Sequence, residues 1–125
     1  MGIAFRGVKN EIECRAFAKL PKHYREDGTL KTENVAFWLT VKRVPYETLK
    51  KFGEVATSDE HTTEEELEFY LDNIVGWRDV LDEDGVAVEF NEDNLVEFLT
   101  IISYKVAVAE AFVNANVGES SKRKN

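Results

Sequence analysis

The sequence predicts an α+β fold, with a small, mostly antiparallel sheet of two β-hairpins, short central helices and a C-terminal helical region. Apolar residues alternate with polar ones over residues 11–20, 34–43 and 75–90, as on half-buried strands. They recur at helical spacing over residues 63–74 and 91–116. The 125 residues, of which 43% are hydrophobic and 32% charged, match one domain of ordinary composition.

The first hairpin is predicted from residues 11–20 and 34–43. One face of the earlier strand would carry Ile12, Cys14, Ala16, Ala18 and Leu20, and one face of the later strand Val35, Phe37, Leu39 and Val41. The β-branched and aromatic content of the later strand favours this structure. Residues 21–33 are polar and include the turn sequence Glu26-Asp27-Gly28, so we expect a long loop between the strands.

Two short central helices are expected next. Pro45 suits the first turn of a helix, where its missing N–H is not needed, and Gly53 suits the C-terminal cap. Residues 54–61 are expected to form a loop. Thr63 and Glu66 match a capping box, in which their side chains satisfy free backbone donors at the start of the second helix. The apolar face of that helix would consist of Leu67, Tyr70, Leu71 and Ile74.

The second hairpin and the C-terminal helices complete the chain. Residues 75–81 and 86–90 are expected to pair around the turn at Asp84-Gly85. Asn91 is a good N-cap for the helix that follows, and Ser103 is a candidate break or bend in it. Its apolar stripe comprises Leu95, Phe98, Leu99 and Ile102, continued by Tyr104, Val108, Ala111, Phe112 and Ala115 to about Asn116.

The chain is expected to form one α+β domain over residues 1–117, followed by a flexible polar tail at residues 118–125. No apolar segment approaches the roughly 20 residues that span a bilayer, and the N-terminus does not resemble a secretory signal. The single cysteine, Cys14, excludes an intrachain disulfide and fits a reducing compartment. The net charge of −8 argues against general binding to nucleic acid or to anionic membranes.

The acidity is concentrated in one block of the chain. Residues 58–97 contain 15 acidic side chains and one basic side chain, Arg78, so their net charge is −14. The segments before and after this block carry +4 and +2. A solvated surface and acidic first turns of helices explain much of this pattern. The alternative is an acidic surface for a basic partner.

A search for catalytic or metal-binding patterns finds none that is specific. Asp82-Glu83-Asp84-Gly85 suggests calcium, but an EF-hand loop with Gly85 sixth would need acids where Val80 and Asn91 stand. The scattered candidates for zinc binding or nucleophilic catalysis are His23, His61 and Cys14. We therefore predict that the protein is not an enzyme and uses no metal and no cofactor.

Two other features have a structural and a functional interpretation. Trp38 and Trp77 lie on predicted strands, where packing in the core is the simpler explanation. The C-terminal apolar stripe can pack on the protein's own sheet. It can also contact a partner, because recognition of a helix in a groove uses the same spacing of apolar anchors.

A succession of local features between about residues 34 and 110 resembles a known family. The features are an acidic helix at residues 64–71, a strand with Gly76-Trp77, a turn at Asp84-Gly85, Phe90 closing the hairpin, and a helix opening with Asn94-Leu95. This pattern is similar to the tail assembly chaperones of long-tailed, siphovirus-like bacteriophages and prophages. The segment from the Gly-Trp pair to the Phe is its most specific part.

The resemblance implies a non-enzymatic role. Such chaperones bind and solubilise the long helical tape-measure protein in the host cytoplasm, promote assembly of tail-tube protein around it, and are usually absent from the mature virion. Many also exist in a longer, frameshifted form. The family has no catalytic residues to transfer. As a hypothesis, the acidic block keeps the complex soluble and the apolar stripe binds the partner, through Leu95, Phe98, Leu99, Tyr104, Val108 and Phe112.

Two other classes of function remain open at this point. The protein could be a structural component of a tail or other particle, which also needs no active site. It could instead be an acidic mimic of nucleic acid that binds a basic partner, although the many apolar residues within the acidic block argue against this. The oligomeric state, the binding face and the host do not follow from the sequence.

Overall fold

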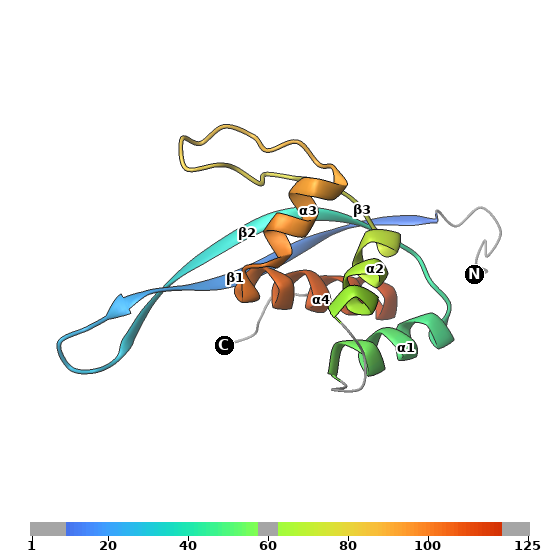
Figure 1. Cartoon of the computed structure of the whole chain (residues 1–125), viewed down its shortest axis with the longest axis horizontal. Helices are drawn as coiled ribbons and strands as arrows, with labels where there is room; N and C mark the ends of the chain where they lie inside the picture. The colour runs from blue at the N-terminus through green and yellow to red at the C-terminus, as the bar shows by residue number, and fades with distance from the viewer. Residues whose placement is uncertain (1–9, 58–62, 119–125) are drawn as a thin grey trace, which may run out of the picture.

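An antiparallel sheet of three strands in the order β1-β2-β3 forms one layer of the fold, and helices form the other (Figure 1). The computed structural model describes residues 10–57 and 63–118. The elements in chain order are β1 (Glu11–Tyr24), β2 (Leu30–Lys42), α1 (Tyr46–Thr57), α2 (Thr63–Asn73), β3 (Ile74–Arg78), α3 (Glu92–Leu99) and α4 (Ile102–Val117). This arrangement confirms the predicted α+β class.

The first hairpin has the predicted inward face. Cys14 lies opposite Leu39, and Ala16 lies opposite Phe37, so the alternating apolar residues of the two strands meet on one side of the sheet. The Ala16 and Leu39 side chains are fully buried there. Because successive residues of a strand point to opposite faces, this register places every second residue in the core.

The predicted long loop over residues 21–33 is wrong. β1 continues to Tyr24 and β2 begins at Leu30, so both strands extend as a two-stranded ribbon beyond the helices (Figure 1). All side chains of residues 21–34 are exposed. Backbone pairing does not require burial, and for this reason the polar composition was misleading. The ribbon turns at Gly28, whose φ of 88° is in the left-handed region that favours glycine.

Both central helices form, but their ends differ from expectation. α1 continues through Gly53 to Thr57, because Phe52 and Val55 on either side are buried and keep this face packed. Gly53 is therefore not the cap. α2 begins at Thr63 as predicted, but the Thr63 side chain of the proposed capping box lies outside the described part of the chain, as do residues 58–62.

The second hairpin is reduced to an irregular loop. β3 pairs with β2, and the predicted return strand makes one isolated bridge, between Leu81 and Ala87. At Asp79 the backbone adopts a φ of 65°, where the chain turns out of the sheet. The turn at Gly85 is confirmed by its φ of 77°. The alternation that suggested a strand is not matched by burial, since Val86 is 59% exposed.

The C-terminal region divides into two helices. The Asn91 side chain accepts a 2.8 Å hydrogen bond from the Asn94 backbone N–H, which confirms the predicted N-cap of α3. The break lies at Thr100 and Ile101, whereas Ser103 is inside α4. α4 ends at Val117 and is capped by Gly118, and residues 119–125 of the expected tail lie outside the described residues. No helix in the described part of the chain is long and apolar enough to cross a membrane.

The hydrophobic core lies between the sheet and the helices, and α4 contributes most to it through contacts with β1. An aromatic cluster joins α1, α2 and α4, because the Phe52 ring lies 5.0 Å from Phe69 and 5.1 Å from Phe112 between centroids. The buried core residues come from every helix and strand; they include Ala16, Leu39, Phe52, Tyr70, Ile74, Leu95 and Val108.

Candidate partner-binding groove

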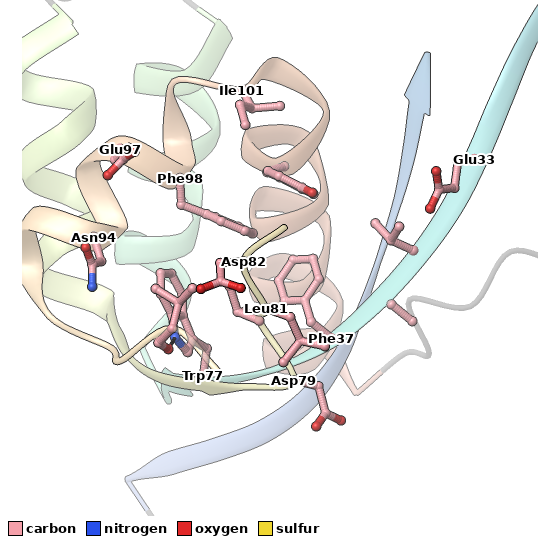
Figure 2. A pocket seen from close by; sticks show the side chains of 15 residues that line it. Glu33, Phe37, Trp77, Asp79, Leu81, Asp82, Asn94, Glu97, Phe98 and Ile101 are labelled. Atoms are coloured by element: carbon pink, nitrogen blue, oxygen red, sulfur yellow. Dashed lines mark hydrogen bonds between the residues drawn. The ribbon is translucent and has the colours of Figure 1, made fainter. Parts of the chain in front are cut away.

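A groove with a cavity of about 710 Å³ opens between β2, the irregular loop after β3, and the corner between α3 and α4 (Figure 2). The groove forms because β3 pairs with only a short part of β2. β3 contacts β2 only over Trp38–Val41, and the chain turns out of the sheet at Asp79. The preceding part of β2 therefore faces an open space instead of a third strand. Cavities of several hundred Å³ are typical of binding sites.

Aromatic side chains form the floor of the groove. Phe98 stacks on Tyr104 with ring centroids 4.2 Å apart, and the Phe37 ring meets Phe98 edge-on at 5.3 Å. Trp77 lies 5.1 Å from Phe98 between centroids. Phe98 and Tyr104 are only half-buried, so they combine fixed positions with an accessible surface. Rigid aromatic groups of this kind supply large contact areas at little entropic cost.

Side-chain hydrogen bonds hold the loop that forms the outer wall, residues 79–91. The Trp77 indole Nε1 donates a 2.8 Å hydrogen bond to the backbone carbonyl of Val88. Asn94 donates a bond of the same length from its side chain to the carbonyl of Glu89. At the tip of the loop, the Asp82 carboxylate accepts bonds from two backbone N–H groups. The wall is therefore attached to β3 and α3 although it lacks regular strand pairing.

The five residues of the sequence pattern have distinct positions in this region. Trp77 and Phe90 pack edge-on with ring centroids 5.1 Å apart. Gly85 provides the positive φ of the loop tip, and Asp84 is exposed beside it. Gly76 lies opposite Thr40 in the sheet, where a Cβ atom would make an ordinary 3.6 Å contact. Sterics therefore do not require glycine at this position.

The rim of the groove is both apolar and acidic. Leu81 is 57% exposed and Ile101 is 46% exposed, so both add apolar surface at the rim. The acidic residues that line the groove are Glu33, Asp79, Asp82 and Glu97. The groove can therefore bury apolar groups of a partner at its centre and meet charged groups at its edge.

The six residues that the sequence suggested for partner binding separate into two groups. Leu95, Leu99, Val108 and Phe112 are at most 7% exposed, because α3 and α4 turn these side chains into the hydrophobic core. In this conformation those four side chains belong to the protein's own core. Phe98 and Tyr104 do line the groove.

Sequence reasoning does not point to most of the residues that line the groove, and Trp77, Leu81 and Ile101 are examples. Trp77 was assigned to general core packing, although it lines the groove as well as the core. The sequence predicts a regular strand at Leu81, and Ile101 lies between the two helices and outside the apolar stripe. A usable signal in the sequence is that these are large apolar side chains within or beside the acidic block.

The other sequence candidates do not meet at a site. His23 is exposed on the ribbon, and His61 lies outside the described residues. Cys14 is half-buried, and burial raises the pKa of its thiol to about 11, with a smaller effect of the Glu13 carboxylate. Among the described residues, no three His, Cys, Asp or Glu side chains are placed to hold a metal ion together.

Trp38 lies on the face of the sheet opposite the core. The guanidinium carbons of Arg15 and Arg78 lie 4.8 Å and 4.5 Å from its ring centroid, as in cation–π contacts. Arg78 also pairs with Glu13, at 2.8 Å between nitrogen and oxygen, and this pairing lowers the pKa of Glu13. The expectation of core packing is therefore wrong for Trp38. This cluster stabilises the outer face of the sheet across all three strands.

Comparisons of this chain with protein-family models, with curated proteins and with solved structures find no match. The residues of the chain itself and the groove that they form therefore carry the assignment of function.

Proposed function

We propose that the protein is a tail assembly chaperone of a long-tailed bacteriophage or prophage. It binds the helical tape-measure protein in the host cytoplasm, keeps it soluble, promotes assembly of the tail tube, and leaves before the virion is mature. The observation that carries this proposal is the aromatic groove with exposed Leu81 and Ile101 at its rim. The sequence pattern supports it further, since Trp77, Gly85 and Phe90 shape that groove and its wall.

The groove suits an apolar helix. Such a helix presents three or four anchors at i, i+3, i+4 and i+7 along one face. A cavity of about 710 Å³ has room for several aliphatic side chains. The floor of Phe37, Trp77, Phe98 and Tyr104 is held by ring contacts, so binding requires little ordering of the protein. Covering these groups would also remove the partner's apolar surface from water.

This proposal includes no catalytic step, no cofactor and no metal. The acidic block at residues 58–97 favours one rival function, in which the protein mimics nucleic acid and occupies a basic protein. A mimic needs carboxylates on an open surface, whereas here aromatic residues lie at the centre. A structural role in the particle is a second rival, and mass spectrometry of purified virions would detect the protein if that role were correct.

Co-expression with the tape-measure protein of the same phage or prophage tests the proposal. We expect the wild-type chain to keep that protein in the soluble fraction and to copurify with it. Ile101→Asp and Leu81→Asp place a charge at the rim and should lower the soluble amount several-fold. Val106→Asp is the matched control, because Val106 on α4 is also 46% exposed but lies outside the groove. Equal solubilisation by all variants would contradict binding in the groove.

A further inference from the structure

The segment at residues 79–104 supplies most of the residues that line the groove and is rich in acidic and apolar side chains. Residues 79–104 contain eight acidic side chains and no lysine, arginine or histidine. This segment forms the loop after β3, all of α3 and the start of α4, and it supplies most of the groove lining. Asp79, Asp82 and Glu97 of the acidic block thus lie at the groove, beside its aromatic floor (Figure 2).

Part of this charge is balanced within the chain. Asp79 lies 3.8 Å from Arg15, between carboxylate oxygen and guanidinium nitrogen, and Glu33 pairs with Lys22 on the ribbon. Asp82 accepts hydrogen bonds from backbone N–H groups, which carry no net charge. Among the described residues, no ion pair neutralises Asp82 or Glu97. These two carboxylates are therefore available to a cationic ligand at the rim.

We infer that the groove selects an amphipathic helix whose apolar anchors are flanked by lysine or arginine. The inference rests on the proposed binding of an apolar helix and adds the charge of that helix. Leu81 and Ile101, both exposed at the rim, would contact its apolar face. Asp82 and Glu97 would face the cations beside that face. Charges at the rim of an interface chiefly set specificity and the rate of association.

The charge preference should depend on salt. Solvent-exposed charges are screened over about 8 Å at physiological ionic strength and over about 3 Å at 1 M salt. The apolar contacts are not weakened in this way. A cationic helix should therefore lose its advantage at high salt, while the affinity due to the apolar anchors persists.

Three synthetic helices of about 18 residues test this inference. They share one apolar face of leucines at i, i+3, i+4 and i+7 and differ only in flanking residues, which are lysine, glutamine or glutamate. Isothermal titration calorimetry with the full-length protein gives the three affinities. The double variant Asp82→Asn, Glu97→Gln removes the two rim charges but keeps their shapes. The control Glu68→Gln, Asp72→Asn removes the same charge from exposed positions of α2, outside the groove.

At low salt we expect the lysine helix to bind about tenfold more tightly than the glutamate helix. The rim double variant should lower this ratio several-fold, and the α2 control should leave it unchanged. Equal binding of all three helices would overturn the inference and leave the proposed function intact. An equal fall of this affinity ratio in both double variants would also overturn the inference, since the charge preference would then come from the net charge of the protein alone. If no helix binds, the inference fails, and co-expression with the tape-measure protein decides separately whether the proposed function fails too.

Discussion

The indole nitrogen of Trp77 donates a 2.8 Å hydrogen bond to the backbone carbonyl of Val88 and thereby joins β3 to the returning half of the loop over residues 79–91. The same ring packs between Phe90 and Phe98, each 5.1 Å away between centroids. This side chain adds to the few backbone hydrogen bonds across the loop, from the Val88 N–H to the Val80 carbonyl and from the Asp82 N–H to the Val86 carbonyl. This explains why an irregular loop can form a defined wall of the groove.

Replacing Trp77 by phenylalanine should loosen this wall. Trp77→Phe keeps an aromatic ring but leaves the part-buried carbonyl of Val88 without its donor, at an expected cost of about 1–2 kcal/mol in the free energy of unfolding. Backbone amides of residues 79–91 should exchange hydrogen faster. Urea denaturation and hydrogen-exchange mass spectrometry measure the two effects. Trp38→Phe, on the opposite face of the sheet, is the control and should leave exchange in the loop unchanged.

The Asn116 side chain should also contribute to the stability of the fold. Its Oδ1 accepts a 2.9 Å bond from the Val44 N–H, and its Nδ2 donates to the carbonyls of Lys42 and Phe112. It therefore fixes the end of β2 against the last turn of α4. We expect Asn116→Ala to destabilise the protein by about 1–3 kcal/mol, because the Val44 donor loses its partner. Asn114→Ala on the same helix is the comparison, and an equal loss in both would contradict this role.

The predicted and observed strands agree where the apolar residues that alternate in the sequence are also buried in the structure. The alternation at Ile12, Cys14 and Ala16 identified the inner face of β1 because that face packs against α4. The ribbon beyond Leu20 does not follow from the sequence, because its strands pair through backbone hydrogen bonds while their exposed side chains show no apolar alternation. The return strand was overpredicted, since Val86 alternates with polar residues but remains exposed.

The groove was harder to predict than the fold. The stripe through Leu95, Val108 and Phe112 has the spacing of a binding face, but the same spacing serves a helix that packs on its own sheet. Sequence periodicity cannot separate these two cases. Ile101 lies at the rim because α3 ends at Leu99 and α4 begins at Ile102, whereas the sequence points to Ser103 as the candidate break.

Truncating a core residue of β2 should destabilise the protein much more than truncating a residue on the ribbon. Leu39 is fully buried at the centre of β2, so Leu39→Ala should lower the free energy of unfolding by about 2–5 kcal/mol. Leu30 lies on the ribbon of the same strand and is 43% exposed. Leu30→Ala should cost less than about 1 kcal/mol. Thermal and chemical denaturation measure both values. Similar losses would mean that the ribbon is as tightly packed as the core.

The Cys14 thiol should react slowly and should make stability depend on alkaline pH. Burial raises its pKa from an ordinary value of 9.0 to about 11. The thiolate is the reactive form, so alkylation of the folded protein at about pH 8 should be slower than alkylation of the unfolded chain. The folded state favours the protonated thiol. This contribution to stability is therefore complete below about pH 9 and is lost as the pH rises to about 11.

A variant isolates this effect from other groups that titrate in the same range, including Tyr70, whose pKa burial also raises. The difference in the free energy of unfolding between wild type and Cys14→Ala should shrink as the pH rises from 9 to 11. That difference cancels the titration of Tyr70 and of the lysines, which both proteins share. Alkylation with iodoacetamide, followed by mass spectrometry, provides the matching kinetic profile. A constant difference together with fast alkylation of the folded protein would show that the thiol is not shielded by the hairpin and α4.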